Sequence, residues 1–263
     1  MAKVLTFTIQ KGGCGKTTTT GIVAYLMAQE GHRVLVVDMD SQGNATDFLT
    51  DLEPEDIEGE SILEAFEEMD AKKYVKPGKV KNIDVLPADD YLALWTEWLY
   101  TKFIPAGGTK SLALIELLAP LADDYDYILI DTPPSLGEYT INAICASDYA
   151  VVLAESSKWA FTAIPRLIKM ASLAGEQLGE TIGIAGILRT MNDVRRYDSK
   201  AFVELIGERY PDLVFDTVIK RKAATGRLAV EGFEDNKELK DALELYHPFY
   251  EELKNRLGVT VNV

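Results

Sequence analysis

The chain has 263 residues, of which 47% are hydrophobic and 26% are charged, and its formal net charge at pH 7 is −15. This composition is that of a globular protein with one large core, and it excludes global disorder and a coiled coil. No apolar run approaches the roughly 20 residues of a membrane span, and residues 1–10 lack the pattern of a signal peptide. Two cysteines, Cys14 and Cys145, cannot form a disulfide framework, so we expect a reducing cytoplasm.

Short apolar segments alternate with longer amphipathic segments along the chain. The expected strands are residues 3–9, 33–38, 83–86, 127–131, 150–154, 184–188 and 214–219, and the expected helices include 16–30, 112–121 and 164–178. Near-continuous apolar strands are typical of a parallel sheet that is buried on both faces. The alternation therefore predicts a single α/β domain over 1–263, with a mostly parallel twisted sheet and helices on both faces.

Charge is distributed unevenly. Residues 51–70 hold ten acids and no base, whereas residues 186–227 hold nine bases and six acids. An acidic protein binds nucleic acid only through a locally basic surface, and we expect such a surface in 186–227. The acidic segment, 51–70, is either a solvated face or a docking surface for a basic partner. Aromatic residues gather in a segment at 91–105 that has the character of an insertion, where we expect a small satellite core.

A glycine-rich turn follows the first expected strand and opens the first expected helix. Its residues are Lys11, Gly12, Gly13, Cys14, Gly15, Lys16, Thr17 and Thr18. Glycines allow backbone N–H groups to curl around phosphate oxygens, and the helix N-terminus adds its dipole and free donors. In such a loop the lysine contacts the β- and γ-phosphates and the next hydroxyl ligates Mg²⁺. The sequence therefore predicts a nucleotide site in which Lys16 and Thr17 have these roles.

The loop departs from the usual phosphate-binding form at its start, where Gln10 replaces the first glycine and Lys11 follows. This arrangement resembles the deviant Walker A motif of the ParA/MinD partition and positioning ATPases, and is closest to the short, Soj-like ParA proteins. Residues 36–46, VVDMDSQGNAT, are similar to switch I of that family, and residues 125–137, YDYILIDTPPSLG, are similar to its Walker B and switch II region. The resemblance implies a P-loop NTPase fold and is most specific through about residue 160.

The resemblance also implies roles for matching positions. Lys11 would cross the interface of an ATP-bound homodimer and neutralise charge on the partner's phosphates. Asp40 would position the attacking water, Asp131 would hold the water shell of Mg²⁺, and Asp38 would assist Thr17 and the metal. The expected catalytic residues are thus Lys11, Lys16 and Asp40, and the expected metal-binding residues are Thr17, Asp38 and Asp131.

The nucleotide base is marked less clearly. A guanine site usually carries Asn-Lys-x-Asp late in the chain, and the nearest match, residues 236–239, lacks the final acid. Adenine, and hence ATP, is implied by the resemblance. Thr190, Met191 and Asn192 follow an expected strand at a position suited to adenine contact, and we take Met191 and Asn192 as nucleotide-binding residues.

The resemblance implies partners as well. ParA proteins bind DNA without sequence preference as ATP-bound dimers and respond to a ParB-like centromere-binding protein. The candidate DNA-binding residues are Arg189, Arg195, Arg196, Lys200, Lys220, Arg221, Lys222 and Arg227, of which the cluster 220–222 is the best.

We therefore expect a nucleoid-associated partition ATPase, with two alternatives. One is a MinD-like positioning ATPase, but residues 258–263 carry no base that would favour a membrane surface, so no membrane partner is expected. The other is a metabolic ATP-dependent enzyme of the same superfamily.

Overall fold

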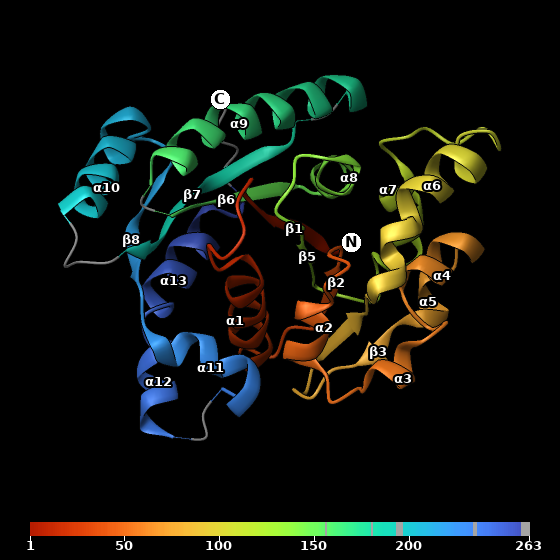
Figure 1. Ribbon diagram of the computed structural model, residues 1–263, viewed down its shortest axis with the longest axis horizontal. Helices are drawn as coiled ribbons and strands as arrows, with labels where there is room; N and C mark the ends of the chain where they lie inside the picture. Colours follow the sequence, from red (N-terminus) through yellow and green to blue (C-terminus); the bar gives the residue numbers. More distant parts are fainter. Residues whose placement is uncertain (156, 180, 193–196, 234–235, 259–263) are drawn as a thin grey trace.

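The structure is a computed structural model that describes residues 1–263 apart from 156, 180, 193–196, 234–235 and 259–263. Its centre is a sheet with the strand order β3-β4-β2-β5-β1-β6-β7-β8 (Figure 1). Every pairing is parallel except that of β3 with β4. The strands are β1 (Lys3–Thr8), β2 (Val34–Asp38), β3 (Lys76–Pro77), β4 (Ile83–Leu86), β5 (Tyr127–Asp131), β6 (Tyr149–Glu155), β7 (Gly183–Asn192) and β8 (Val214–Lys220).

Helices cover both faces of this sheet. The α-helices are α1 (Lys16–Gln29), α2 (Asn44–Leu49), α3 (Pro54–Ile57), α4 (Ile62–Glu68), α5 (Ala71–Tyr74), α6 (Trp95–Trp98), α7 (Ala113–Leu118), α8 (Glu138–Cys145), α9 (Lys158–Leu178), α10 (Tyr197–Arg209), α11 (Ala223–Glu231), α12 (Lys237–Leu243) and α13 (His247–Arg256). Figure 1 shows α1, α2 and α13 on one side of the sheet and α8 and α9 on the other. Three short non-α helical segments are η1 (Asp90–Leu94), η2 (Leu99–Phe103) and η3 (Ala119–Leu121).

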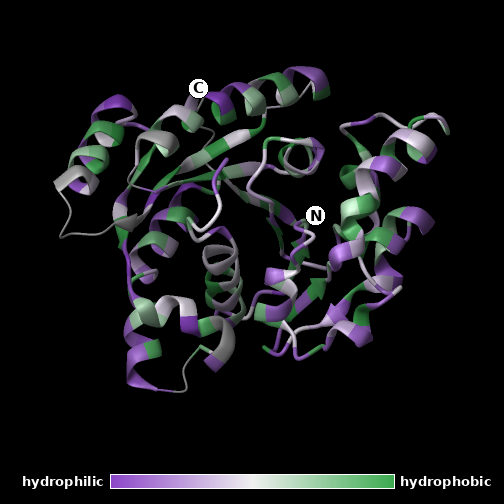
Figure 2. Cartoon of the chain, in the orientation of Figure 1, coloured by the Kyte–Doolittle hydropathy of each residue, from purple (hydrophilic) through white to green (hydrophobic). Residues whose placement is uncertain are grey.

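The two faces of the central strands are both buried. In β2, Val34 and Val36 pack in one hydrophobic cluster, whereas Leu35 and Val37 pack in the other. Alternate side chains of a strand point to opposite faces, so the continuous apolar run serves two cores. Figure 2 shows hydrophobic stretches along strands of the sheet and hydrophilic stretches on the outer helices. The predicted fold class is confirmed.

The aromatic insertion packs into the second main cluster, together with Leu35 and Val37 of β2, so the expectation of a separate satellite core is wrong. Trp95 is fully buried and its ring lies 5.2 Å from that of Phe66 and 4.9 Å from that of Tyr139. The neighbouring acidic segment, 51–70, folds largely as α3 and α4. Ile57 of α3 is buried, and Phe66 of α4 is buried against Trp95. Its acids can remain in water because the segment is amphipathic.

Two features differ from the expected elements. Helix α9 begins at Lys158, six residues before the expected start at 164, because Ser157 caps it by accepting a hydrogen bond from the Ala160 N–H. The short antiparallel strand β3 was not expected, since two residues, Lys76 and Pro77, give no periodic pattern.

Candidate nucleotide site

The glycine-rich turn joins β1 to α1 at the carboxyl edge of the sheet, where the parallel strands end (Figure 1). Gly13 and Gly15 have φ angles of 71° and 85°, which lie in the left-handed region that a side chain disfavours. Gly15 also stands at the N-cap of α1, so the first N–H groups of the helix open onto the turn. The sequence thus builds a cradle of backbone donors at a positive helix end, which suits a phosphate group.

Side chains from both neighbouring sides fix this turn. On one side, the Thr17 hydroxyl donates a 2.6 Å hydrogen bond to Oδ2 of Asp131 at the end of β5. On the other, the Thr190 hydroxyl of β7 donates to the Cys14 carbonyl oxygen at 2.8 Å, and the Lys11 ammonium pairs with Glu155 at the end of β6. The turn is therefore held by the ends of three strands.

Lys16 lies inside the turn. Its side chain is 6% exposed, and its ammonium donates a 3.1 Å hydrogen bond to the Lys11 carbonyl oxygen. The Cys14 thiol is buried and donates to the same oxygen, and burial raises the pKa of that thiol. The structure thus places a cation at the base of the turn, as a phosphate site requires, and keeps Cys14 protonated as a packing group.

Asp38 and Asp131 form a buried acidic pair. They end adjacent strands in register, and both are fully buried. Burial, followed by the charge of Asp131, raises the pKa of Asp38. Burial also raises the pKa of Asp131, opposed by the Thr17 hydrogen bond and the charge of Lys16. Two buried, adjacent carboxylates destabilise the fold unless a cation lies between them. This edge of the sheet is therefore suited to a metal ion.

The residues present fit Mg²⁺ at Thr17 and Asp131. Oδ1 of Asp131 is buried and accepts no hydrogen bond from the described residues. Asp38 is engaged differently, because its Oδ2 accepts the N–H groups of Ala45 and Thr46 and the Thr46 hydroxyl at 2.9–3.0 Å. The structure therefore gives Asp38 the role of ordering the start of α2, and leaves Asp131 and Thr17 as the groups that would face a metal.

Asp40 lies just beyond this pair. Its N–H donates to Oδ1 of Asp38 at 3.1 Å, and its own Oδ1 accepts the N–H of Gln42 at 3.2 Å. The side chain is half-buried, and its charge is among the causes that raise the pKa of Asp131. The expected switch I residues are thus brought to the same edge as the phosphate turn and the acidic pair.

Comparison with known proteins shows the family of this chain. Residues 2–184 match the sequence profile of a family described as AAA domain. Soj of Bacillus subtilis, a sporulation initiation inhibitor protein, is 36% identical over 84% of this chain and 85% of Soj. The chromosome partitioning protein ParA of Myxococcus xanthus is 30% identical over 84% of this chain and 76% of its own length. The chain belongs to the ParA family of P-loop ATPases.

Solved structures have the same fold. A Cyanothece McdA variant in complex with ATP superposes with a TM-score of 0.81 at 26% identity, covering 100% of this chain and 98% of that one. Cobyrinic acid a,c-diamide synthase of Mycobacterium smegmatis, with an ATP analog and magnesium, gives 0.75 at 28% identity, covering 89% and 93%. The ParA-type assignment therefore rests on sequence and on fold, and structural neighbours bind ATP or its analog, one of them with magnesium.

The basic residues expected to contact DNA are placed unequally. Lys220 ends β8 at the carboxyl edge, Arg221 and Lys222 follow it, and all three are exposed. The Lys222 ammonium donates a 3.0 Å hydrogen bond to the Asp241 carbonyl oxygen. In contrast, the Arg189 guanidinium donates to the carbonyl oxygens of Val203, Phe215 and Asp216, with the closest at 2.6 Å. Arg189 therefore serves the packing of this ParA-type domain and is not offered to a ligand.

The other expected contacts divide in the same way. Lys200 is exposed, whereas Arg227 forms ion pairs with Glu231 and Glu238, the latter at 2.6 Å. Arg195 and Arg196 lie outside the described residues. Met191 and Asn192 end β7, and their side chains also lie outside the description. The expected adenine contacts thus stay predictions.

Two residues of the site were missed by sequence reasoning. Thr190, considered as a base contact, instead anchors the phosphate turn through Cys14. Glu155, which pairs with Lys11, was not singled out at all. A signal existed, because Glu155 ends an apolar strand just as Asp38 and Asp131 do. In a parallel sheet, acids at the ends of neighbouring strands meet at one edge.

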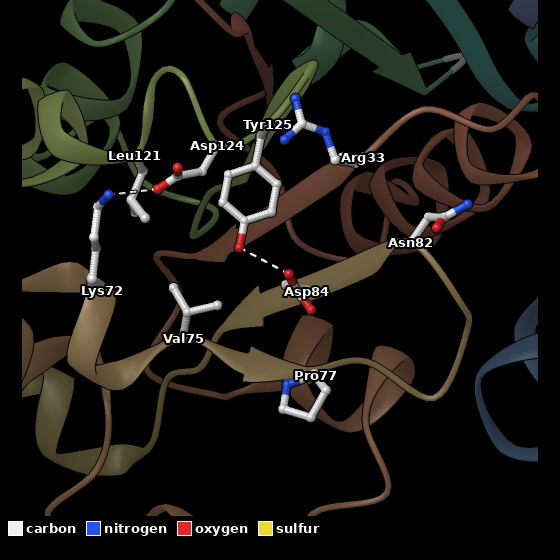
Figure 3. A pocket seen from close by; sticks show the side chains of 9 residues that line it. All are labelled: Arg33, Lys72, Val75, Pro77, Asn82, Asp84, Leu121, Asp124 and Tyr125. Atoms are coloured by element: carbon white, nitrogen blue, oxygen red, sulfur yellow. Dashed lines mark hydrogen bonds and ion pairs between the residues drawn. The ribbon is translucent and has the colours of Figure 1, made fainter.

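A separate hollow lies at the opposite, amino edge of the sheet, where β2, β4 and β5 begin (Figure 3). It has a volume of about 580 Å³. Its charged side chains are mostly paired. Lys72 forms a 2.6 Å ion pair with Asp124, and the Tyr125 hydroxyl donates a 2.9 Å hydrogen bond to Asp84. The described residues that line it include no glycine-rich turn, so it lacks the phosphate chemistry of the carboxyl edge.

No helix in the described part of the chain combines the length and the apolar character that crossing a membrane would require.

Proposed function

We propose that the protein is a Mg²⁺- and ATP-dependent ATPase that dimerises with ATP bound, binds DNA without sequence preference, and partitions plasmid or chromosomal DNA. The observation that carries this proposal is that two lysines of one turn differ in burial and position. Lys16 is buried in the phosphate cradle, whereas the Lys11 side chain is 32% exposed at its rim. A second lysine at the rim is suited to a phosphate group that is brought by another subunit.

The chemistry of the site follows from phosphoryl transfer. Lys16 and the N–H groups at the start of α1 would bind the β- and γ-phosphates, and Thr17 and Asp131 would hold Mg²⁺. Bound Mg²⁺ neutralises negative charge on the phosphate oxygens. Asp40 has a half-buried carboxylate whose charge raises the pKa of Asp131, and it would orient the attacking water. Lys11 would act on the nucleotide of the partner subunit.

DNA binding would depend on the cluster formed by Lys220, Arg221 and Lys222. A chain with a net charge of −15 binds DNA only through a local basic surface. Dimerisation doubles the number of such clusters on one particle, and therefore steepens the dependence of affinity on salt. This supports binding that is controlled by ATP rather than binding by the free subunit.

A ParB-like partner would stimulate hydrolysis, and the acidic segment offers it a surface. A hollow of about 410 Å³ beside switch I is lined by residues 41–43 and by acids of three segments. These acids are Asp47, Glu55, Glu58, Asp89 and Asp90. A basic segment of the partner docked there would contact residues that immediately follow Asp40, so docking and turnover would be coupled.

The proposal is tested by fluorescence anisotropy with labelled duplexes of unrelated sequences, in ATP, in ADP and without nucleotide. We expect binding in ATP alone, with equal affinity for all duplexes and a steep loss with salt. Binding that ignores the nucleotide, or the absence of binding in ATP, would contradict partition by a ParA-type cycle. The Lys16→Ala variant is the control, because it removes the phosphate contact and should not bind.

The second candidate is a metabolic ATP-dependent enzyme, favoured by the likeness to the diamide synthase. Such an enzyme would hydrolyse ATP only with its small-molecule substrate and would show no ATP-dependent DNA binding. The anisotropy experiment therefore separates the two candidates.

A further inference from the structure

The ion pair between Lys11 and Glu155 connects the phosphate turn to β6 within one subunit. Glu155 is the last residue of β6, which lies next to β1 in the sheet. The two side chains are 32% and 28% exposed, so water reaches the pair but does not surround it. The Glu155 carbonyl oxygen accepts a 2.7 Å hydrogen bond from the Ser157 N–H, which fixes the backbone of Glu155. Glu155 is thus a fixed acceptor at the rim of the site.

The backbone and the side chain of Lys11 are held separately. Its carbonyl oxygen accepts hydrogen bonds from the Lys16 ammonium and the Cys14 thiol, both at 3.1 Å. Its ammonium pairs with Glu155. Because the backbone is held inside the turn, the side chain can change partners without unfolding the loop. Negatively charged acceptors therefore compete for the Lys11 ammonium, and the strongest of them binds it.

We propose that Glu155 is a positioning residue for Lys11, which holds the lysine in its own subunit and competes with the phosphates of the partner's nucleotide. This inference rests on the proposed role of Lys11 across a dimer interface. Formation of the ATP-bound dimer must break the Lys11–Glu155 pair, so Glu155 weakens the dimer and raises the protein concentration at which it assembles. The pair also keeps the exposed ammonium from binding anions unproductively in the single subunit.

The competition is electrostatic, so substitutions that remove the charge of Glu155 but keep its shape distinguish it from a packing role. Replacing Glu155 by Gln keeps the shape and removes the charge, so Lys11 is released. Replacing it by Asp keeps the charge but shortens the reach, so an intermediate effect is expected. A partly exposed pair is screened by salt, so the effect of Glu155→Gln should shrink as ionic strength rises.

The test measures the dimer dissociation constant by sedimentation velocity, with Mg²⁺ and a slowly hydrolysed ATP analogue. Glu155→Gln should tighten the dimer about twofold to fivefold at low salt, which is the range expected of an exposed ion pair. Glu176→Gln, an exposed acid on α9, is the matched control, because it changes the net charge equally without touching Lys11. In a Lys11→Ala background, Glu155→Gln should not restore the dimer, because it acts only by releasing Lys11.

Two outcomes would overturn the inference, and they differ in what else they overturn. If the parent dimerises and Glu155→Gln leaves its dissociation constant unchanged or weakens the dimer, competition by Glu155 is wrong while the proposed function stands. If the parent stays monomeric with the analogue, the proposed ATP-dependent dimer is wrong and the competition falls with it. If Glu155→Gln and Glu176→Gln tighten the dimer equally, the change in net charge alone explains the effect, and the inference is also overturned.

Discussion

The carboxyl and amino edges of the sheet both carry charged groups, but under opposite conditions. At the carboxyl edge, Asp38 and Asp131 are fully buried, and one oxygen of Asp131 has no hydrogen-bond partner among the described residues. At the amino edge, the charges around the hollow of Figure 3 are largely exposed, and Lys72 already has Asp124 as its partner. A buried charge without a partner is strongly destabilising, whereas an exposed ion pair contributes about 0–1 kcal/mol.

This difference indicates that the functional site lies at the carboxyl edge. A fold retains an unfavourable arrangement only where a ligand or a reaction compensates for it. The phosphate turn, switch I and the basic cluster 220–222 all follow strands that end at the carboxyl edge. At the amino edge the charged side chains are paired with one another, so substitutions there provide a control for substitutions at the carboxyl edge. Substitutions at the two edges should separate function from stability.

The largest effect is expected from Asp40→Ala. Loss of the group that orients water should lower the turnover of ATP about 100-fold or more, while ATP and Mg²⁺ still bind. Steady-state phosphate release and binding of a fluorescent ATP analogue measure the two quantities. Asp124→Ala, an exposed acid at the amino edge, is the control and should keep parental turnover. Similar turnover in both variants would remove Asp40 from catalysis.

The next effect concerns DNA. Replacing Lys220, Arg221 and Lys222 by Ala should weaken ATP-dependent DNA binding about tenfold or more, and lower the salt slope by about 1 for every phosphate that the variant no longer neutralises. Basal ATP turnover should persist. The control replaces Lys72, Lys73 and Lys81 by Ala, exposed lysines near the amino edge with the same total charge. If the two triple variants lose equal affinity, the basic cluster is not the DNA surface.

How well the site could be predicted depended on how local its signals are. The phosphate turn and every strand except β3 were predicted, because glycine spacing and apolar runs are properties of neighbouring residues. The roles of Asp38, Asp40 and Asp131 came instead from the resemblance to the family and stay predictions. Glu155 and Thr190 were missed as anchors of the turn, because their partners are 144 and 176 residues away. For the same reason, the sequence could not tell that Arg189 is engaged by carbonyl oxygens of later elements.

A smaller effect is expected at the acidic hollow beside switch I. Glu55→Lys combined with Glu58→Lys should reduce stimulation by a ParB-like partner about twofold to fivefold at low salt, since exposed charges mainly change association. Asp51→Lys combined with Glu67→Lys gives the matched charge change outside the hollow. Stimulation should be measured as ATP turnover over a range of salt. An unchanged response of the first variant would leave the acidic segment as a solvated face.

The smallest functional effect is expected from Tyr125→Phe at the amino edge. The substitution removes the hydroxyl that donates to Asp84 and should lower the free energy of unfolding by about 1 kcal/mol. Urea denaturation measures this loss. ATP turnover should stay at the parental value, because no step of the proposed cycle uses this edge. A variant that folds stably but turns over ATP slowly would show that the two edges are coupled.

The most direct test of the central claim is the molar mass of two variants in the presence of Mg²⁺ and ATP, measured by light scattering after size-exclusion chromatography. The account predicts that Asp40→Ala, which binds ATP without hydrolysing it, has twice the mass of one chain. It also predicts that Lys11→Ala, which lacks the ammonium that crosses the interface, stays at the mass of one chain. A monomeric Asp40→Ala, or a Lys11→Ala that dimerises equally well, would contradict an ATP-assembled dimer joined through Lys11.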